Sequence, residues 1–350
     1  MRRILGVSTQ KLDAPQTLML DPVVFMRKRL SGVLCIIFLS IPPIAGAAAE
    51  ITVHRVGDKI DIELDSRPFT SFHFGSNWPK PFLHPLRSPS GVVVTRGFPV
   101  EEIEGESRDH RWHRGLFFGH GDIQGIDFWR EIGPEKKRFP LPVGSIVLRA
   151  LAPAQKVEDA AVVAATFDLQ APGPRRMGSL RQRYRFHKLG KHNAIDARMT
   201  LTADAGQSLK MGDTEEGTFA IRVAPGLRQD QGATLRNAQG LVGTENIWGE
   251  ASQWVDYSGR VEGQTVGIAI FDHPSNPKHP THWHARGYGL FSANPFGEHD
   301  FYGDPIRDGS LTIEDGKTLT LRYRVVVHEG DGASLDLESL YRSYAAEEPN

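Results

Sequence analysis

The sequence predicts an all-β protein built as a large antiparallel β-sandwich, and three observations support this fold class. Apolar and polar side chains alternate with a period of two through several separate segments, which is typical of half-buried strands. The chain contains 36 Gly and 23 Pro, so the connections between these segments are expected to be turns and loops rather than helical crossovers. Helical spacing is found only in one short stretch near the C-terminus.

The alternation is clearest in five segments, each with apolar side chains at every second position. They cover residues 60–64, 163–169, 184–186, 195–201 and 319–327. The helical stretch places Leu337, Leu340, Tyr341 and Tyr344 on one side, which predicts a short C-terminal helix that docks on the sandwich.

The composition excludes some classes of partner. The 350 residues are 39% hydrophobic and 24% charged, and 41 Lys plus Arg balance 42 Asp plus Glu to a formal charge of -1. A chain so close to neutrality has no field that would gather a polyanion. We therefore expect no nucleic acid partner, and we expect no nucleotide cofactor.

The N-terminal segment has the order of a secretory signal. Basic residues at 26–29 precede an apolar run at 30–41 and a small-residue string at 45–49. The apolar run has about a dozen residues, short of the ~20 that cross a bilayer, so the mature chain is expected to have no membrane span. The only cysteine, Cys35, would be removed with the signal. The predicted organisation is an upstream extension at 1–25, a signal peptide at 26–49 starting at Met26, and a single β-sandwich domain at 50–350 that is periplasmic or secreted.

A histidine-rich segment at residues 272–297 carries a polar strand face. If Thr281 to Tyr288 is extended, alternate side chains point the same way. A row of two imidazoles, a guanidinium and a phenol is costly to bury without partners, so we expect this face to meet water or a polar ligand. The row consists of His282, His284, Arg286 and Tyr288, with Trp283, Ala285 and Gly287 on the other side.

A second histidine-rich segment, "DHRWHRGLFFGHGDIQGIDFW", covers residues 109–129. His113 and His120 have opposite parity, so on a regular strand they would point to opposite faces. They can share a site only if Gly115 or Gly119 resets the register.

A third segment, "GDTEEGTFAIRVA" at 212–224, places Asp213, Glu215 and Glu216 at the start of an alternating strand. Acids in this position are often solvated turn residues, and they are also suitable partners for a catalytic imidazole.

These three segments, together with "PFLHPLRSPSGVVVTRGFP" and "WVDYSG", resemble the DUF6807 family, often labelled PmoA family or methane oxygenase, over residues 70–305. The resemblance implies a galactose-mutarotase-like sandwich and an exported protein of polysaccharide-degrading bacteria. A membrane oxygenase subunit needs several apolar spans, which the predicted mature chain lacks. The residues that match are His110, His113, His120, Asp122, Asp127, Glu216, His282 and His284.

The sequence departs from the family pattern at two places. The usual Asp-His-Pro-His-His is Asp109-His110-Arg111-Trp112-His113 here, so no role carries over for the middle histidine. Glu215 stands where a lysine is expected.

The main hypothesis is an exported carbohydrate-active enzyme, either a hydrolase, a lyase or an epimerase, that uses acid–base chemistry on a sugar or glycoside. Histidine and carboxylate groups exchange protons near neutral pH. Tryptophans offer flat faces to sugar C–H groups, and Arg286 can bind hydroxyls or a carboxylate. The predicted catalytic residues are His113, His120, His284 and Glu216. The predicted substrate-binding residues are Trp112, Asp122, Asp127, Trp129, His282, Arg286 and Tyr288.

Two alternatives stay open at this point. His110, His113, His282 and His284 could hold a divalent metal such as Zn²⁺ or Cu²⁺ and give a metalloprotein with oxidative or hydrolytic activity. The same polar side chains could also bind a glycan without turnover.

Overall fold

The computed structural model describes residues 50–133, 138–173 and 175–348, which lie in one compact unit, Ala47–Asn350. The predicted extension at 1–25 and signal peptide at 26–49 lie outside the described residues and stay predictions.

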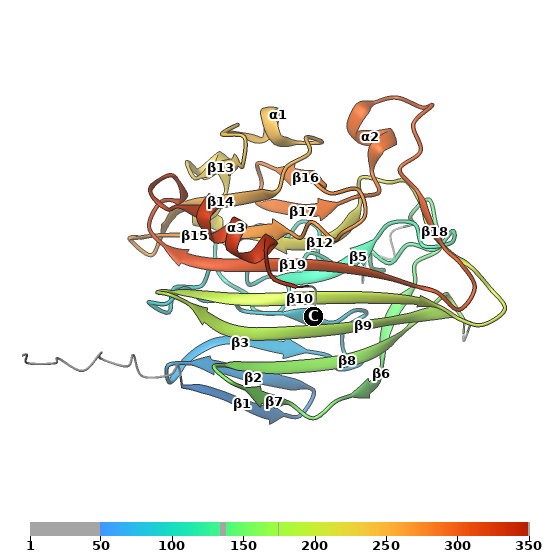
Figure 1. Cartoon of the computed structure of the whole chain (residues 1–350), viewed down its shortest axis with the longest axis horizontal. Coiled ribbons are helices and arrows are strands. Elements are labelled where there is room, and N and C mark those ends of the chain that lie inside the picture. The colour runs from blue at the N-terminus through green and yellow to red at the C-terminus, as the bar shows by residue number, and fades with distance from the viewer. Residues whose placement is uncertain (1–49, 134–137, 174, 349–350) are drawn as a thin grey trace, which may run out of the picture. The chain divides into compact units, whose positions relative to one another are not determined.

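Two large antiparallel sheets pack against each other within the described residues, and a two-stranded sheet stands beside them (Figure 1). This confirms the predicted sandwich. The eight-stranded sheet has the order β1 (Ile51–Val56), β2 (Lys59–Leu64), β3 (Arg67–His73), β4 (Phe82–Leu83), β5 (Leu116–His120), β12 (Gly217–Arg222), β17 (Leu290–Asn294) and β16 (His282–Arg286).

The nine-stranded sheet has longer strands, and each of its neighbouring pairs is antiparallel. Its order is β13 (Thr234–Asn237), β14 (Trp254–Val261), β15 (Gln264–Asp272), β19 (Thr318–Glu329), β10 (His192–Ala203), β9 (Arg176–Leu189), β8 (Ala160–Gln170) and β6 (Ser145–Leu151), with β7 (Gln155–Val157) on β8. The two-stranded sheet joins β11 (Leu209–Met211) to β18 (Leu311–Ile313). The five segments predicted from alternation lie in β2, β8, β9, β10 and β19.

Apolar side chains from the inner faces of both large sheets form the main core. Aromatic rings meet between the sheets: Phe219 of β12 stacks on Tyr323 of β19 at 4.6 Å between centroids, and Tyr257 of β14 lies 5.2 Å from Phe291 of β17. Burying one such side chain contributes about 1.5–3 kcal/mol. The inward side chains of both large sheets therefore stabilise the same core.

Helices are short in the described part of the chain. The predicted docking helix is confirmed as α3 (Leu337–Ala345), whose Asp336 cap accepts a hydrogen bond from the Ser339 N–H at 2.9 Å. Leu337, Tyr341 and Tyr344 pack on the outer side of the nine-stranded sheet in a small core separate from the main one. The others are α1 (Thr244–Ile247), α2 (Glu298–Tyr302) and the 3-10 turns η1 (Pro225–Leu227), η2 (Gln229–Gln231) and η3 (Gly332–Ser334). Among the described residues, no helix has the length and apolar character needed to cross a membrane.

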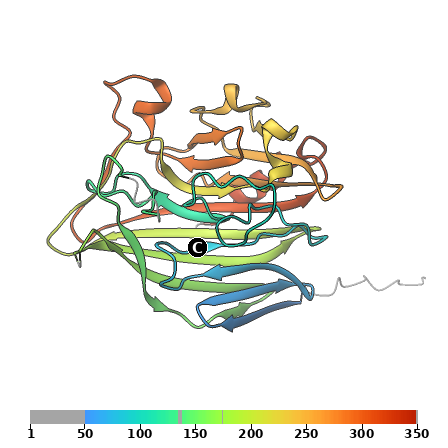
Figure 2. The ribbon, with the colours of Figure 1, turned by 180° about the vertical axis from the view of Figure 1, so that it is seen from behind.

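Loops cover the outer face of the eight-stranded sheet. Outward side chains of β5, β12 and β17 pack there against tryptophans from the loops on either side of β5, which are coloured teal in Figure 2. This third cluster consists of Phe82, Trp112, Phe117, Trp129, Ala220 and Leu290. Polar side chains surround it, and we call the outer side of β5, β12, β17 and β16 the polar face.

Candidate functional site on the polar face

Strand β16 supplies the predicted row of polar side chains. Trp283 and Ala285 are fully buried in the main core, and His282, His284 and Arg286 point to the polar face. The predicted alternation is confirmed. Of the two expected surroundings, bulk water and a polar ligand, bulk water does not apply to His284, because the covering loops leave it only 2% exposed.

Two adjacent carboxylates, Glu215 and Glu216, lie just before β12, and we call them the carboxylate pair. Arg286 Nη2 donates to Glu215 at 2.7 Å. Arg130 Nη2 donates to Glu216 at 2.7 Å, and its Nη1 donates to Asp127 at 3.0 Å. The side chain of Glu216 is 18% exposed and that of Arg286 is 33% exposed. The carboxylate pair therefore lies where the polar face reaches the surface.

Burial raises the pKa of Glu216 to about 6; Arg130 opposes the shift and Glu215 adds to it. Burial also raises the pKa of Glu215, and Arg286 opposes that shift. A carboxyl group with a pKa near 6 can exchange a proton close to neutral pH. Glu216 is thus equipped for acid–base chemistry.

His284 contacts the neighbouring arginine. The Arg286 Nε–H donates to His284 Nε2 at 3.0 Å, which places the proton of a neutral ring on Nδ1. Burial, reinforced by the charge of Arg286, lowers the pKa of His284 to about 3. The imidazole is therefore neutral and holds the guanidinium that reaches Glu215.

His113 lies deeper, below the loop surface. Its ring is parallel to that of His110 at 4.9 Å and edge-on to that of Trp129 at 5.3 Å. An Arg222 N–H points at His113 Nδ1 from 3.4 Å. Burial, and then the charge of Arg222, hold the pKa of His113 well below its usual value, so this imidazole is also neutral.

A second set of charged side chains, centred on Asp109, extends from Arg222 beside His113 to the surface. Asp109 accepts hydrogen bonds from Arg96 at 2.9 Å, from Arg222 at 2.8 Å and from the ring of His110. Burial would raise the pKa of Asp109, but the bonds from His110 and Arg222 outweigh it and keep the pKa low. His110 is half exposed, has a left-handed backbone with φ of 41°, and lies parallel to the Tyr288 ring at 5.3 Å.

The side chains of several predicted residues have partners other than the carboxylate pair. His120 Nε2 bonds the Gly212 carbonyl at 2.8 Å and its ring meets Phe296 of the main core. His282 Nε2 lies 3.0 Å from the Tyr302 hydroxyl beside α2. Asp122 accepts from the Gly125 N–H in a turn. His120 thus points away from His113, as their parity predicts.

The remaining predicted residues support the face from below. Trp129 is fully buried and Trp112 is 8% exposed, so neither offers a flat surface to a ligand. Asp127 accepts from the N–H groups of Trp129 and Arg130, both at 2.8 Å. It therefore fixes the turn that aims Arg130 at Glu216.

Sequence reasoning missed three arginines. Arg130 bridges Asp127 and Glu216, and Arg96 and Arg222 converge on Asp109. For Arg222 a signal existed, because it alternates with Ile221 and Phe219 of the core and so must point outward from β12. For Arg130 the only signal was its place next to Trp129.

The four candidate metal ligands do not gather. Among the described residues, no group of three or more His, Asp or Glu side chains is arranged to hold a metal ion. His110 and His113 face each other, whereas His284 bonds Arg286 and His282 bonds Tyr302. The geometry gives the metalloprotein hypothesis no support.

Fold and site define an antiparallel β-sandwich with a histidine- and carboxylate-bearing face on one sheet. The model of the family of unknown function DUF6807 matches residues 59–342, and the chain belongs to this family. The PmoA label is not shown by any comparison. No curated protein matches the chain.

Solved structures with a similar course of the chain are distant in sequence. A galactose mutarotase-like protein from Clostridium acetobutylicum is 8% identical with a TM-score of 0.38, covering 81% of this chain and 99% of that one. A putative aldose 1-epimerase from Escherichia coli K12 is 10% identical with a TM-score of 0.32, covering 81% and 100%. A GH36 alpha-galactosidase from Geobacillus stearothermophilus is 8% identical with a TM-score of 0.37, and the chain spans 41% of its length.

Proposed function

We propose that this protein is an exported enzyme that uses acid–base chemistry on a sugar or glycoside, with Glu216 as its proton-exchanging group. The observation that carries the proposal is the state of this carboxyl group, which is partly exposed and has a pKa raised to about 6 between Arg130 and Glu215. Export rests on the signal-like segment at 26–49.

The neighbours of Glu216 suit a polyhydroxylated substrate. Arg130 and Arg286 are partly exposed guanidinium groups that can donate to ring hydroxyls or to a substrate carboxylate. The Tyr288 hydroxyl group and the His110 ring lie within electrostatic range of Glu216, and groups of both kinds can hydrogen-bond sugar hydroxyls.

In this proposal the two buried imidazoles act through other residues. His284 positions Arg286, because its Nε2 accepts from the Arg286 Nε–H. His113 packs between His110 and Trp129 and so fixes the loop that carries His110. Both rings are neutral at pH 7, and Glu216 is mostly ionised, so Glu216 acts first as the base. Hydrolysis, elimination and epimerisation at a sugar ring each need such a proton acceptor.

The arrangement also favours a second candidate, a glycan-binding module without turnover. Both members of the carboxylate pair are already in ion pairs with arginines at 2.7 Å. Groups held in this way can serve as fixed acceptors for ligand hydroxyls without a proton transfer.

One experiment separates the two candidates. The purified protein is incubated with glycosides, 3-keto-glycosides and free aldoses, products are followed by mass spectrometry and, for epimers of equal mass, by NMR spectroscopy, and binding is measured by calorimetry. We expect turnover that falls by about 10²–10⁴-fold in Glu216→Gln. The matched control is Glu314→Gln, which changes an exposed glutamate in the turn after β18.

The outcomes are distinct. Turnover that is equal in wild type and Glu216→Gln contradicts the assignment of Glu216. Saturable glycan binding with no product from any substrate selects the binding module.

A further inference from the structure

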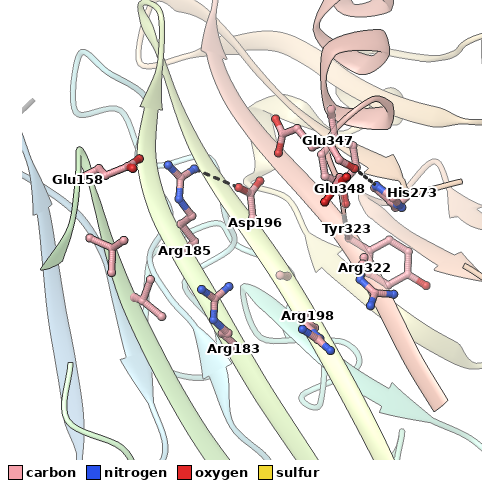
Figure 3. A pocket seen from close by; sticks show the side chains of 14 residues that line it. Glu158, Arg183, Arg185, Asp196, Arg198, His273, Arg322, Tyr323, Glu347 and Glu348 are labelled. Atoms are coloured by element: carbon pink, nitrogen blue, oxygen red, sulfur yellow. Dashed lines mark hydrogen bonds and ion pairs between the residues drawn. The ribbon is translucent and has the colours of Figure 1, made fainter. Parts of the chain in front are cut away.

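A cavity of about 560 Å³ lies on the other side of the molecule, on the outer face of the nine-stranded sheet. Its floor is formed by β8, β9, β10 and β19, and residues just after α3 form part of its wall (Figure 3). The volume is within the usual range for sites that bind small molecules. None of the residues of the polar face lines it.

Three arginines cross the cavity floor in one register. Arg183 of β9 is paired with Arg198 of β10, and Arg198 is paired with Arg322 of β19. All three line the cavity and are half-buried. We call them the arginine row. Like charges on directly opposed strand positions destabilise a sheet, so the row costs free energy in the unliganded protein.

The arginine row has no direct carboxylate partner within the described residues, and Asp196 acts on Arg183 only from a distance. No carboxylate forms an ion pair with Arg183, Arg198 or Arg322 in the described part of the chain. Arg322 donates through Nη1 to the Ser275 hydroxyl at 3.2 Å, and its buried Nε has no partner there. Burial and then the charge of Arg198 lower the pKa of Arg183, as expected when cations crowd one another.

The opposite end of the cavity carries carboxylates beside paired arginines. Asp196 lies two residues further along β10 on the same face, where it contacts Arg185 at 3.4 Å and accepts from Arg324 at 2.5 Å. Glu158 and Glu347 stand at the edge of the same cavity, and Glu347 also accepts from Arg324. Figure 3 shows the arginine row at one end and these carboxylates at the other. One end therefore suits an oxyanion, and the other suits hydroxyl donors.

We propose that this cavity binds a small anionic sugar, with its phosphate, sulfate or carboxylate group on the arginine row and its hydroxyls toward Asp196 and Glu158. Guanidinium groups bind such oxyanions through paired N–H donors. Neighbouring strands are ~4.8 Å apart, so an oxyanion placed above Arg198 is within reach of Arg183 and Arg322 as well.

The test is calorimetric titration of the purified protein with glucose 6-phosphate, glucose 6-sulfate, glucuronate, inorganic phosphate and glucose, with chloride used to keep the ionic strength constant. We expect saturable 1:1 binding of at least one anionic sugar and none of glucose. The three anionic sugars show which oxyanion the row selects, and inorganic phosphate that binds as tightly as glucose 6-phosphate would contradict recognition of the sugar.

Matched variants locate the binding. Arg198→Gln removes the centre of the row and is expected to weaken binding by about tenfold or more. Arg181→Gln changes an exposed arginine on the same face of β9 that does not line the cavity, and it should bind like wild type. Arg183→Gln serves as the second row variant if Arg198→Gln fails to fold by circular dichroism.

The proposal is overturned if no anionic sugar binds, or if the row variants bind as tightly as Arg181→Gln. It is independent of the polar face, so Glu216→Gln should leave this binding unchanged.

Discussion

The buried arginines of the polar face and the arginine row of the nine-stranded sheet differ in how their charges are balanced. On the polar face, buried cations contact carboxylates: Lys80 and Arg114 both contact Glu131, and Arg96 and Arg222 both contact Asp109. On the nine-stranded sheet, the arginine row sets like charges side by side.

Burial explains the difference. The arginines under the loops of the polar face are 1–2% exposed, and a charge this deep must have a partner of opposite sign. The arginine row is only half-buried, so water offsets part of the repulsion. The paired arginines under the loops hold a fixed geometry, whereas the arginine row, which has no ion pair within the described residues, suits a ligand.

Removing a buried partner should give the largest effect. Glu131 accepts from Arg114 at 2.6 Å and lies 3.0 Å from Lys80, with all three side chains nearly inaccessible. We expect Glu131→Ala to lower the free energy of unfolding by about 3–5 kcal/mol, because it leaves two buried cations without an anion. Urea denaturation measures this loss. Glu102→Ala, which breaks the exposed pair with Arg108, should cost no more than about 1 kcal/mol; equal losses would contradict the comparison.

The charges around Glu216 on the polar face should also set the pH dependence of turnover. If ionised Glu216 is the base, kcat/KM rises with pH through a midpoint near 6. Arg130 lowers the pKa of Glu216 and Glu215 raises it, so Arg130→Gln should move the midpoint up and Glu215→Gln should move it down. A midpoint that stays in place in both variants would show that another group titrates.

The nine-stranded sheet also contains a buried ion pair, His328 with Asp256, which contrasts with its arginine row. His328 Nε2 lies 2.9 Å from Asp256, and both side chains are fully buried. Burial would lower the pKa of His328, but the ion pair with Asp256 outweighs it and raises the pKa above 6.5. The pair therefore stabilises the fold fully below pH 6.5, and this contribution is lost as the pH rises through the raised value.

The measurement for this pair is the difference in unfolding free energy between wild type and Asp256→Asn from pH 5 to 9. Burial and then the charge of His328 lower the pKa of the nearby His192 to about 4, so the difference is read above pH 6.5, where the folded His192 is neutral. A difference that does not shrink above pH 6.5 would exclude a charged His328.

The smallest effect should have the opposite sign. Arg198→Gln removes a repulsive neighbour from both Arg183 and Arg322, so we expect the ligand-free protein to become more stable by about 0.2–1 kcal/mol. The gain should decrease as salt screens the row. Thermal unfolding at low and high salt measures it, with Arg175→Gln, which changes an exposed arginine outside the row, as the control. A loss of stability at low salt would show that the row is not repulsive.

Much of the fold could be predicted from the sequence, because alternation reports directly which strand face is buried. The five alternating segments, the helix α3 and the inward positions of Trp283 and Ala285 are examples. The site was less accessible to such reasoning, since alternation says that a side chain leaves the main core but not what then covers it. The polar face was expected to meet water or a polar ligand for this reason, and the pattern could not show that loops bury His284 while Arg286 stays partly exposed.

The histidines of the 109–129 segment illustrate the same limit. Parity separates His113 from His120 correctly, but it cannot show that β5 begins only at Leu116. Gly115, with φ of 46°, makes the turn before the strand, and a Cβ there would collide with the Leu83 carbonyl oxygen. The ion pair of Arg130 with Glu216 joins residues 86 positions apart, which no local pattern reports.

The separate small core beneath α3 predicts how a ligand in the arginine cavity would change amide hydrogen exchange in this helix. A helix held by Leu337, Tyr341 and Tyr344 outside the main core can detach without global unfolding. Tyr344 and Glu347 also line the arginine cavity. Occupancy of that cavity should therefore slow amide hydrogen exchange in the C-terminal helix while leaving the protection of the central strands unchanged.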